Sequence, residues 1–256
     1  MLYPSFSRRA RAVWWRNLLA WRKFCRSSIL LNFGEPVMNL VALGFGLGAY
    51  VTRIGDRSFL EFIAPGLLAV TAMNSVVYDL GFDGFDRLRT TGVYDAMATS
   101  PLSVSEIVGG ELLWEATRSI IYGLVFLSVL AAFGLVHSVW VAGLPVVLFL
   151  NGFLFGALTL AVVSVAQVHE HLFFYFTLVI TPMFMFSGVF FPVDRMPSAL
   201  AWVVKAFPLY HVVELTRSLV LGGVSAANLV HLGWLLFLTL AALALPVPLL
   251  QRALYR

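Results

Sequence analysis

Two glutamates one helical turn apart come nearest to a catalytic pair in this sequence. Glu111 and Glu115 stand at i and i+4 before a long apolar run, and Arg118 follows three residues later. Two carboxylates can act as general acid and base, but catalysis also needs a nearby histidine, a nucleophile or a metal-ligand set. None accompanies them here. We therefore expect no catalytic residue, and on a helix we expect Glu115 to pair with Arg118.

Other patterns that would indicate a chemical site are incomplete. His169 and His171 are two residues apart, which is not the i, i+4 spacing of a helical zinc site, so we expect polar contacts and no metal. The glycines from Gly44 to Gly48 lie in an apolar run with no strand before them, which excludes a dinucleotide fingerprint. Neither lysine, Lys23 or Lys205, belongs to a G-x-x-x-x-G-K-[ST] loop. The chain therefore has no phosphate cradle of that kind.

The composition predicts an integral membrane protein. Hydrophobic residues make up 60% of the chain and charged residues 12%, against about 25% charged in soluble domains. The single cysteine, Cys25, excludes an intrachain disulfide. The net charge of +4 comes from a basic N-terminus, so it predicts a membrane topology and no nucleic-acid partner.

The apolar runs predict an all-α fold with six transmembrane helices in one domain over residues 1–256. The expected spans are residues 29–51, 59–80, 112–136, 139–168, 172–191 and 228–250. Pro36 should kink the first span, and Glu35 should face protein or water. The small-xxx-small pairs at Gly44–Gly48 and Gly152–Gly156 permit close helix packing.

A basic helix is expected at the N-terminus, within residues 1–28. It carries seven basic residues and no acid. Trp14, Leu18, Trp21 and Cys25 share one helical face, so the helix should lie in the membrane interface.

Two polar segments separate the spans. In residues 81–110, a short helix from Val93 should stop before Pro101, and Ser103 and Glu106 have the spacing of a capping box. Residues 192–223 are amphipathic and interrupted by prolines, which predicts two short half-buried helices that re-enter the membrane. A loop lying on the membrane surface is the alternative.

The distribution of basic residues predicts the orientation. With a cytoplasmic N-terminus, twelve of the 17 Lys and Arg residues fall on the cytoplasmic side, as the positive-inside rule requires. Both termini and residues 81–110 are then cytoplasmic, and residues 192–223 face outward.

Several of these features together resemble the membrane subunit of type-2 ABC exporters. They are the basic helix, Glu35-Pro36, the segment Thr99-Ser-Pro-Leu-Ser103, and the run Ser187-Gly-Val-Phe-Phe-Pro192 with Pro208-Leu-Tyr-His-Val-Val-Glu-Leu-Thr-Arg217. The resemblance implies a homodimer in the bacterial cytoplasmic (inner) membrane with two copies of a separate ABC ATPase. ATP and Mg would be bound by that partner, and this chain would bind no cofactor. The transport path would lie between the two copies, bordered by the first, second and fifth spans.

The resemblance also implies roles for individual residues. The ATPase-coupling segment would use Arg89, Tyr94, Asp95, Met97, Thr99 and Pro101. The N-terminal helix would make a second contact through Arg11, Trp14 and Arg22. The extracellular gate would comprise Ser187, Gly188, Phe190, Phe191, Pro192, Pro208, Glu214 and Arg217.

The cargo follows from a narrower similarity. Phe33-Gly-Glu-Pro-Val-Met-Asn-Leu40 and Leu43-Gly-Phe-Gly-Leu-Gly48 resemble the nodulation-factor export permeases. An amphipathic, lipo-chitooligosaccharide-like glycolipid is then expected, in contact with membrane lipid. A hydrophobic drug or another lipid-linked glycan is the alternative cargo. A secondary transporter and an intramembrane enzyme are alternative classes, but the acids cluster near the predicted span ends and no nucleophile–base pair appears.

Overall fold

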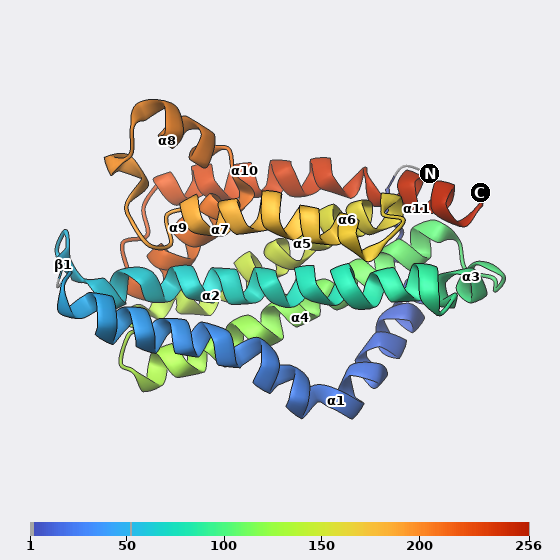
Figure 1. Cartoon of the computed structure of the whole chain (residues 1–256), viewed down its shortest axis with the longest axis horizontal. Helices are drawn as coiled ribbons and strands as arrows, with labels where there is room; N and C mark the ends of the chain where they lie inside the picture. The colour runs from blue at the N-terminus through green and yellow to red at the C-terminus, as the bar shows by residue number, and fades with distance from the viewer. Residues whose placement is uncertain (1–2, 52, 256) are drawn as a thin grey trace.

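The computed structural model describes residues 3–51 and 53–255, apart from the side chains of residues 31–33 and 35. It is an elongated bundle of helices with one small hairpin (Figure 1). The long helices are α1 (Arg8–Val41), α2 (Phe59–Tyr78), α4 (Val104–Ala132), α5 (Leu144–Val165) and α10 (Ala227–Leu243). The shorter ones are α3 (Val93–Ala98), α6 (His169–Tyr175), α7 (Thr181–Phe186), α8 (Ser198–Lys205), α9 (Pro208–Leu221) and α11 (Pro246–Leu254). The hairpin consists of β1 (Arg53–Ile54) and β2 (Arg57–Ser58).

Within the described residues, four helical runs are long and apolar enough to cross a membrane. They are Phe59–Thr90, Val104–Ala132, Val139–Val165 and Ala227–Leu254, and they correspond to the predicted second, third, fourth and sixth spans. The first predicted span has a shorter apolar helix, Pro36–Ala49. The fifth is divided into α6, a π-helical turn (Phe176–Ile180) and α7. Six membrane crossings therefore stay a prediction.

The N-terminal helix and the first predicted span form one element. α1 begins after Ser7, whose side chain accepts hydrogen bonds from the first-turn amides, and it runs through Pro36 to Val41. A π-helical turn (Ala42–Gly46) and a 3-10 turn (Leu47–Ala49) continue it. Figure 1 shows α1 as two arms that meet at an angle. The predicted environment of the Glu35 side chain lies outside the described residues.

The segment predicted to be cytoplasmic, residues 81–110, is more helical than expected. The second span continues through two π-helical segments, Asp79–Gly84 and Asp86–Thr90. Gly92 ends this run with φ +64°, a conformation that costs glycine little. The predicted short helix is α3, and the capping box between Ser103 and Glu106 at the start of α4 is confirmed.

The two helices in residues 192–223 differ from each other, contrary to the expectation of two half-buried helices. α8 projects from the end of the bundle (Figure 1), and Trp202 is 77% exposed. α9 instead packs beside α2 and α10 and buries Leu209, Val212 and Val213.

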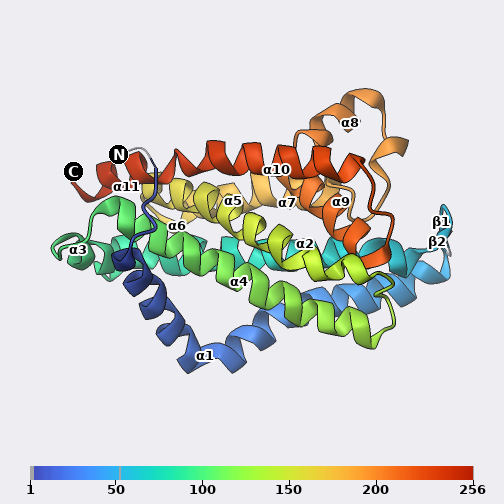
Figure 2. The ribbon, with the colours of Figure 1, turned by 180° about the vertical axis from the view of Figure 1, so that it is seen from behind.

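Figures 1 and 2 show both termini and α3 at one end of the bundle, with α8 and the hairpin at the other. We call these the α3 end and the α8 end. At the bundle centre, Gly152 brings α5 against the backbone of Ala116 and Glu115 in α4, so the second small-xxx-small pair makes the predicted close contact. In the first pair, Gly44 faces only the side chain of Leu60.

Candidate functional site

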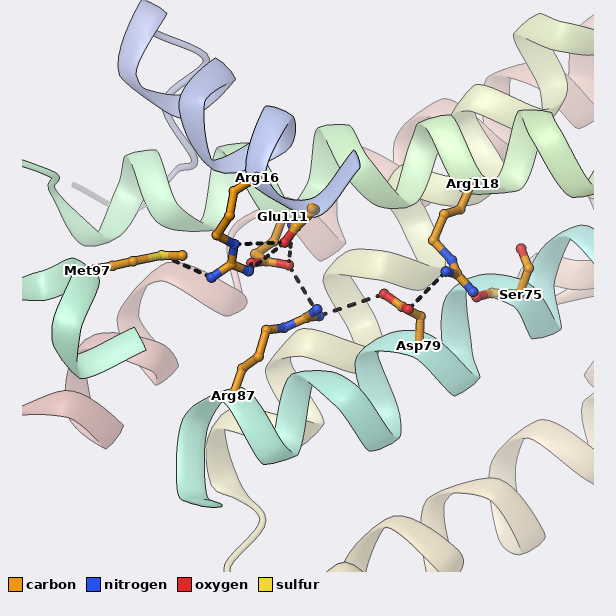
Figure 3. Close-up of polar contacts among 8 residues, drawn as sticks. Arg16, Ser75, Asp79, Arg87, Met97, Glu111 and Arg118 are labelled. Atoms are coloured by element: carbon orange, nitrogen blue, oxygen red, sulfur yellow. Dashed lines mark hydrogen bonds and ion pairs between the residues drawn. The ribbon is translucent and has the colours of Figure 1, made fainter. Parts of the chain in front are cut away.

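Charged side chains of alternating sign form a chain through the α3 end, shown in Figure 3. In order, they are Arg16, Glu111, Arg87, Asp79 and Arg118, and we call them the charged network. They come from α1, from the helical run that continues α2, and from α4. The network therefore joins three elements that are distant in sequence.

Glu111 is the centre of the network and is fully buried. Arg16 Nη2 and Arg87 Nη2 each lie 3.4 Å from its carboxylate, and Asn17 Nδ2 donates a hydrogen bond of 3.0 Å to Oε2. Burial lowers the pKa of Arg16, and the opposing charge of Glu111 counters that shift. A buried carboxylate without such partners would be costly, so Glu111 needs both α1 and the second helical run in place.

Arg118 closes the other end of the network. Its Nη1 lies 2.9 Å from Asp79 Oδ1, and its Nε donates to the Ser75 carbonyl at 3.1 Å. The Tyr122 ring centroid is 5.1 Å from the guanidinium carbon. The predicted pairing of Arg118 with Glu115 is wrong: among the described ion pairs, Arg118 contacts Asp79 instead.

The network also reaches α3. Arg16 Nη1 lies 3.9 Å from the sulfur of Met97. Tyr94 is fully buried, and burial together with the nearby Glu111 raises its pKa. The resemblance implies that Tyr94 contacts the ATPase, but its side chain is buried inside this chain and is not presented to a partner. Tyr94 belongs to the hydrophobic core and anchors α3 to the bundle.

The remaining residues predicted for ATPase coupling are on the surface. Asp95, Thr99 and Pro101 are exposed. Arg89 is exposed too, but its Nε donates to the Ala166 carbonyl at 3.2 Å, so it caps the end of α5. The exposed face of α3 is thus formed by the residues around Asp95 and Thr99.

The aromatic stripe of the N-terminal helix packs on protein. Trp14 Nε1 donates to Thr117 Oγ1 at 3.0 Å, and Trp21 Nε1 donates to Tyr122 Oη at 3.2 Å. This face of α1 covers α4, whereas we expected it to face the membrane interface. Arg11 and Arg22 are exposed.

The structure brings several of the predicted gate residues together at the α8 end. Arg217 Nη2 donates to the Gly188 carbonyl at 2.6 Å, Arg217 Nη1 pairs with Glu214, and the guanidinium lies 4.1 Å from the Phe62 ring centroid. Gly188 has φ +79°. α9, the turn at Gly188 and α2 are therefore tied by one arginine.

The other predicted gate residues have different surroundings. Ser187 is buried, and Phe190 packs against Phe184 with ring centroids 5.1 Å apart. Phe191 is exposed, Pro192 precedes a 3-10 turn, and Pro208 is the first residue of α9.

A histidine pair that sequence reasoning did not find lies beside the gate residues. His211 Nε2 donates to the Lys205 carbonyl at 2.9 Å, which leaves its Nδ1 to accept from Nδ1 of His231 at 3.0 Å. Trp234 stacks on the His211 ring. The sequence separation of 20 residues hid this pair. By contrast, the expected polar contacts of His169 and His171 are present, with Asp86 and the Gln167 amide.

We predict that the protein loses thermal stability as the pH falls from about 6.5 toward 4. Burial and the adjacent His231 lower the pKa of His211 to about 4, below the ordinary value of about 6.5. In this range the unfolded chain binds a proton that folded His211 does not bind, so acid favours unfolding. Melting temperatures at pH 7.5 and 5.0 should differ less in His211→Asn than in the parent. The exposed-histidine control His137→Asn should keep the parent's difference, and an unchanged difference in His211→Asn would refute the prediction.

The sequence is similar to one protein family and to several bacterial proteins. Residues 8–221 match the family described as ABC-2 type transporter. The chain is 36% identical to Nodulation protein J of Rhizobium leguminosarum bv. viciae, over 96% of this chain and 95% of the relative. It is 37% identical to Nodulation protein J of Rhizobium meliloti (strain 1021), over 87% and 83%. It is also 25% identical to the daunorubicin resistance ABC transporter permease protein DrrB1 of Streptomyces coeruleorubidus, over 94% and 84%.

Proposed function

The chain belongs to the ABC-2 type transporter family, and from that premise we propose that it is the membrane subunit of an ATP-driven exporter in the bacterial cytoplasmic membrane, with both termini in the cytoplasm. The family makes it a transporter membrane subunit rather than an enzyme. Association with an ABC ATPase accompanies that family. We further propose a homodimer with two ATPase copies, which bind the ATP and Mg.

The charged network is the observation that carries the mechanism. The ion pairs around Glu111 join α1, the helical run that continues α2, and α4. α3 is anchored beside them by buried Tyr94 and by the contact of Met97 with Arg16. A push on the exposed face of α3 therefore moves these helices as one body. ATP binding by the partner would shift the population between a state closed outward and a state open outward.

The transport path is supported by a polar hollow in an otherwise apolar region. A cavity of about 200 Å³ lies between α1, α2 and the π-helical turn that leads into α7. Asn39, Thr71, Asn74 and Thr181 contribute polar groups to its lining. In a homodimer, this face would border the path between the two copies.

For the cargo, we propose an amphipathic glycolipid of the lipo-chitooligosaccharide type. Relatives named Nodulation protein J, similar over nearly the whole chain, support this choice. A hydrophobic drug is the second candidate, because the chain is also similar to a daunorubicin resistance permease.

Reversing the charge of Asp95 should weaken binding of the ATPase. Asp95 is exposed on α3, so Asp95→Lys alters the proposed docking face without disturbing the buried network. We expect at least a fivefold loss of co-purified ATPase, measured by quantitative gel analysis from mild detergent. Glu170→Lys, at an exposed acid on α6, is the matched control. Equal ATPase recovery with both variants would remove α3 from the interface.

A further inference from the structure

A second and larger cavity lies inside the angle of α1, at the α3 end of the bundle. It encloses about 670 Å³ between α1, the π-helical segment that begins at Asp79, and α4. That volume is within the range of about 300–1,000 Å³ typical of small-molecule sites. It belongs to a single copy of the chain, and Tyr78 lines both this cavity and the smaller hollow beside α7.

Aromatic rings form much of the lining. They are Trp21, Phe24, Tyr78, Phe82 and Trp114. The faces of such rings carry partial negative charge and attract the polarised C–H groups of a flat ligand. A wall of this kind suits the apolar faces of sugar rings.

The charged residues of the lining have both signs. Asp79 and Asp83 supply acceptors, and Lys23, Arg87 and Arg118 supply donors. Asp83 is exposed and is absent from the ion pairs of the described residues. A site for a phosphate headgroup would concentrate donors, whereas hydroxyl and amide groups need donors and acceptors together.

The polar groups behind this lining also have unused hydrogen-bonding capacity. Within the described structure, Oδ2 of Asp79 and the Nε and Nη2 atoms of Arg87 are buried without a hydrogen-bond partner. The Asp79–Arg87 ion pair is long, at 3.7 Å. Buried groups of this kind are normally satisfied, so an acceptor and donors without hydrogen-bond partners lie beside the cavity.

We propose that this cavity binds the uncharged sugar head of the cargo at the cytoplasmic end of the bundle. The proposal rests on the export function above and specifies where the glycan is first held. The sugar faces lie on Trp21 and Phe24, and hydroxyl or N-acetyl groups bond to Asp83 and Arg87. Arg87 also contacts Glu111. A ligand that bonds to Arg87 would therefore also affect the ion pairs of the charged network.

Protection of an introduced cysteine tests this site. In a Cys25→Ser background, Ser27→Cys places the sole thiol on the cavity lining. The full chain, purified with its ATPase, is alkylated with a maleimide in the presence of chitotetraose, an uncharged N-acetylglucosamine oligomer. We expect saturating chitotetraose to slow labelling at least fivefold, and glycerol 3-phosphate at equal concentration to leave the rate unchanged.

Two variants locate the effect. Asp83→Asn should raise the chitotetraose concentration needed for half-protection at least fivefold. Asp86 lies three residues away, outside the lining, and pairs with His169. The variant Asp86→Asn should therefore behave like the parent.

Retained ATPase in every preparation would show that the exporter assembly is intact. Absence of chitotetraose protection in such a preparation would overturn the proposed sugar site while leaving the exporter function standing. Protection by glycerol 3-phosphate alone would assign the cavity to an anionic headgroup and would also overturn it. Loss of the ATPase itself would instead count against the proposed function.

Discussion

Replacing Glu111 by alanine should lower the free energy of unfolding by about 3–5 kcal/mol, the usual cost of removing one partner from a buried ion pair. Glu111 is fully buried and faces Arg16, Arg87 and the amide of Asn17. Its removal leaves two guanidinium groups without their shared carboxylate. Thermal unfolding of the purified protein in detergent, followed by intrinsic fluorescence, measures the effect.

Two further variants separate charge from packing in this prediction. Glu111→Gln keeps the shape and an acceptor for Asn17 but loses the charge, so its melting temperature should fall between those of the parent and the alanine variant. Glu170→Ala, at an exposed acid, should change stability by no more than about 0.5 kcal/mol. Equal melting temperatures for Glu111→Ala and Glu170→Ala would show that the network does not hold the helices together.

Gly152→Ala should destabilise the protein by about 1–3 kcal/mol, the range for forcing extra carbon into a packed core. A Cβ atom at Gly152 would overlap the Cα of Ala116 and lie 2.7 Å from the Glu115 carbonyl oxygen. Both obstacles are backbone, so no side-chain rotation relieves the clash. α4 and α5 would have to move apart. Thermal unfolding again provides the measurement.

The same substitution elsewhere supplies the control. A Cβ at Gly233 in α10 would have no neighbour within 4 Å. Since alanine has a helix propensity better than that of glycine by about 1 kcal/mol, Gly233→Ala should be neutral or stabilising. A stabilising effect at both positions would contradict the close α4–α5 contact.

Hydrophobicity and a local capping signal predicted four of the long helical runs. The helices containing Phe59–Thr90, Val104–Ala132, Val139–Val165 and Ala227–Leu254 follow from apolar length. The start of α4 follows from the Ser103–Glu106 capping box. These are local properties, and a single segment contains all the information they need.

The partners of charged residues could not be predicted in the same way. Asp79 lies near the end of the predicted second span, and its partner Arg118 comes from another helix. Asp79 is buried, and the helical run continues beyond the predicted end of this span to Thr90. Helical spacing offered Glu115 as the partner of Arg118, but the packing of α2 against α4 decided the pairing.

The sequence also did not reveal which faces of α1 and α3 are buried. An apolar stripe shows that something covers it, but it does not reveal that Trp14 and Trp21 donate hydrogen bonds to side chains of α4. α3 was correctly expected near Val93, but which of its side chains face inward depends on α1 and α4. Tyr94 was therefore placed on the wrong side of α3.

ATP-dependent transport in reconstituted vesicles is the most direct test of the central claim. The purified chain and its co-purified ATPase are placed in liposomes, and movement of a fluorescent lipo-chitooligosaccharide to the leaflet opposite the ATPase is followed by quenching. The account predicts transport with ATP and Mg and none with a non-hydrolysable ATP analogue. Equal transport without ATP, or by the chain alone, would contradict it and favour a secondary transporter.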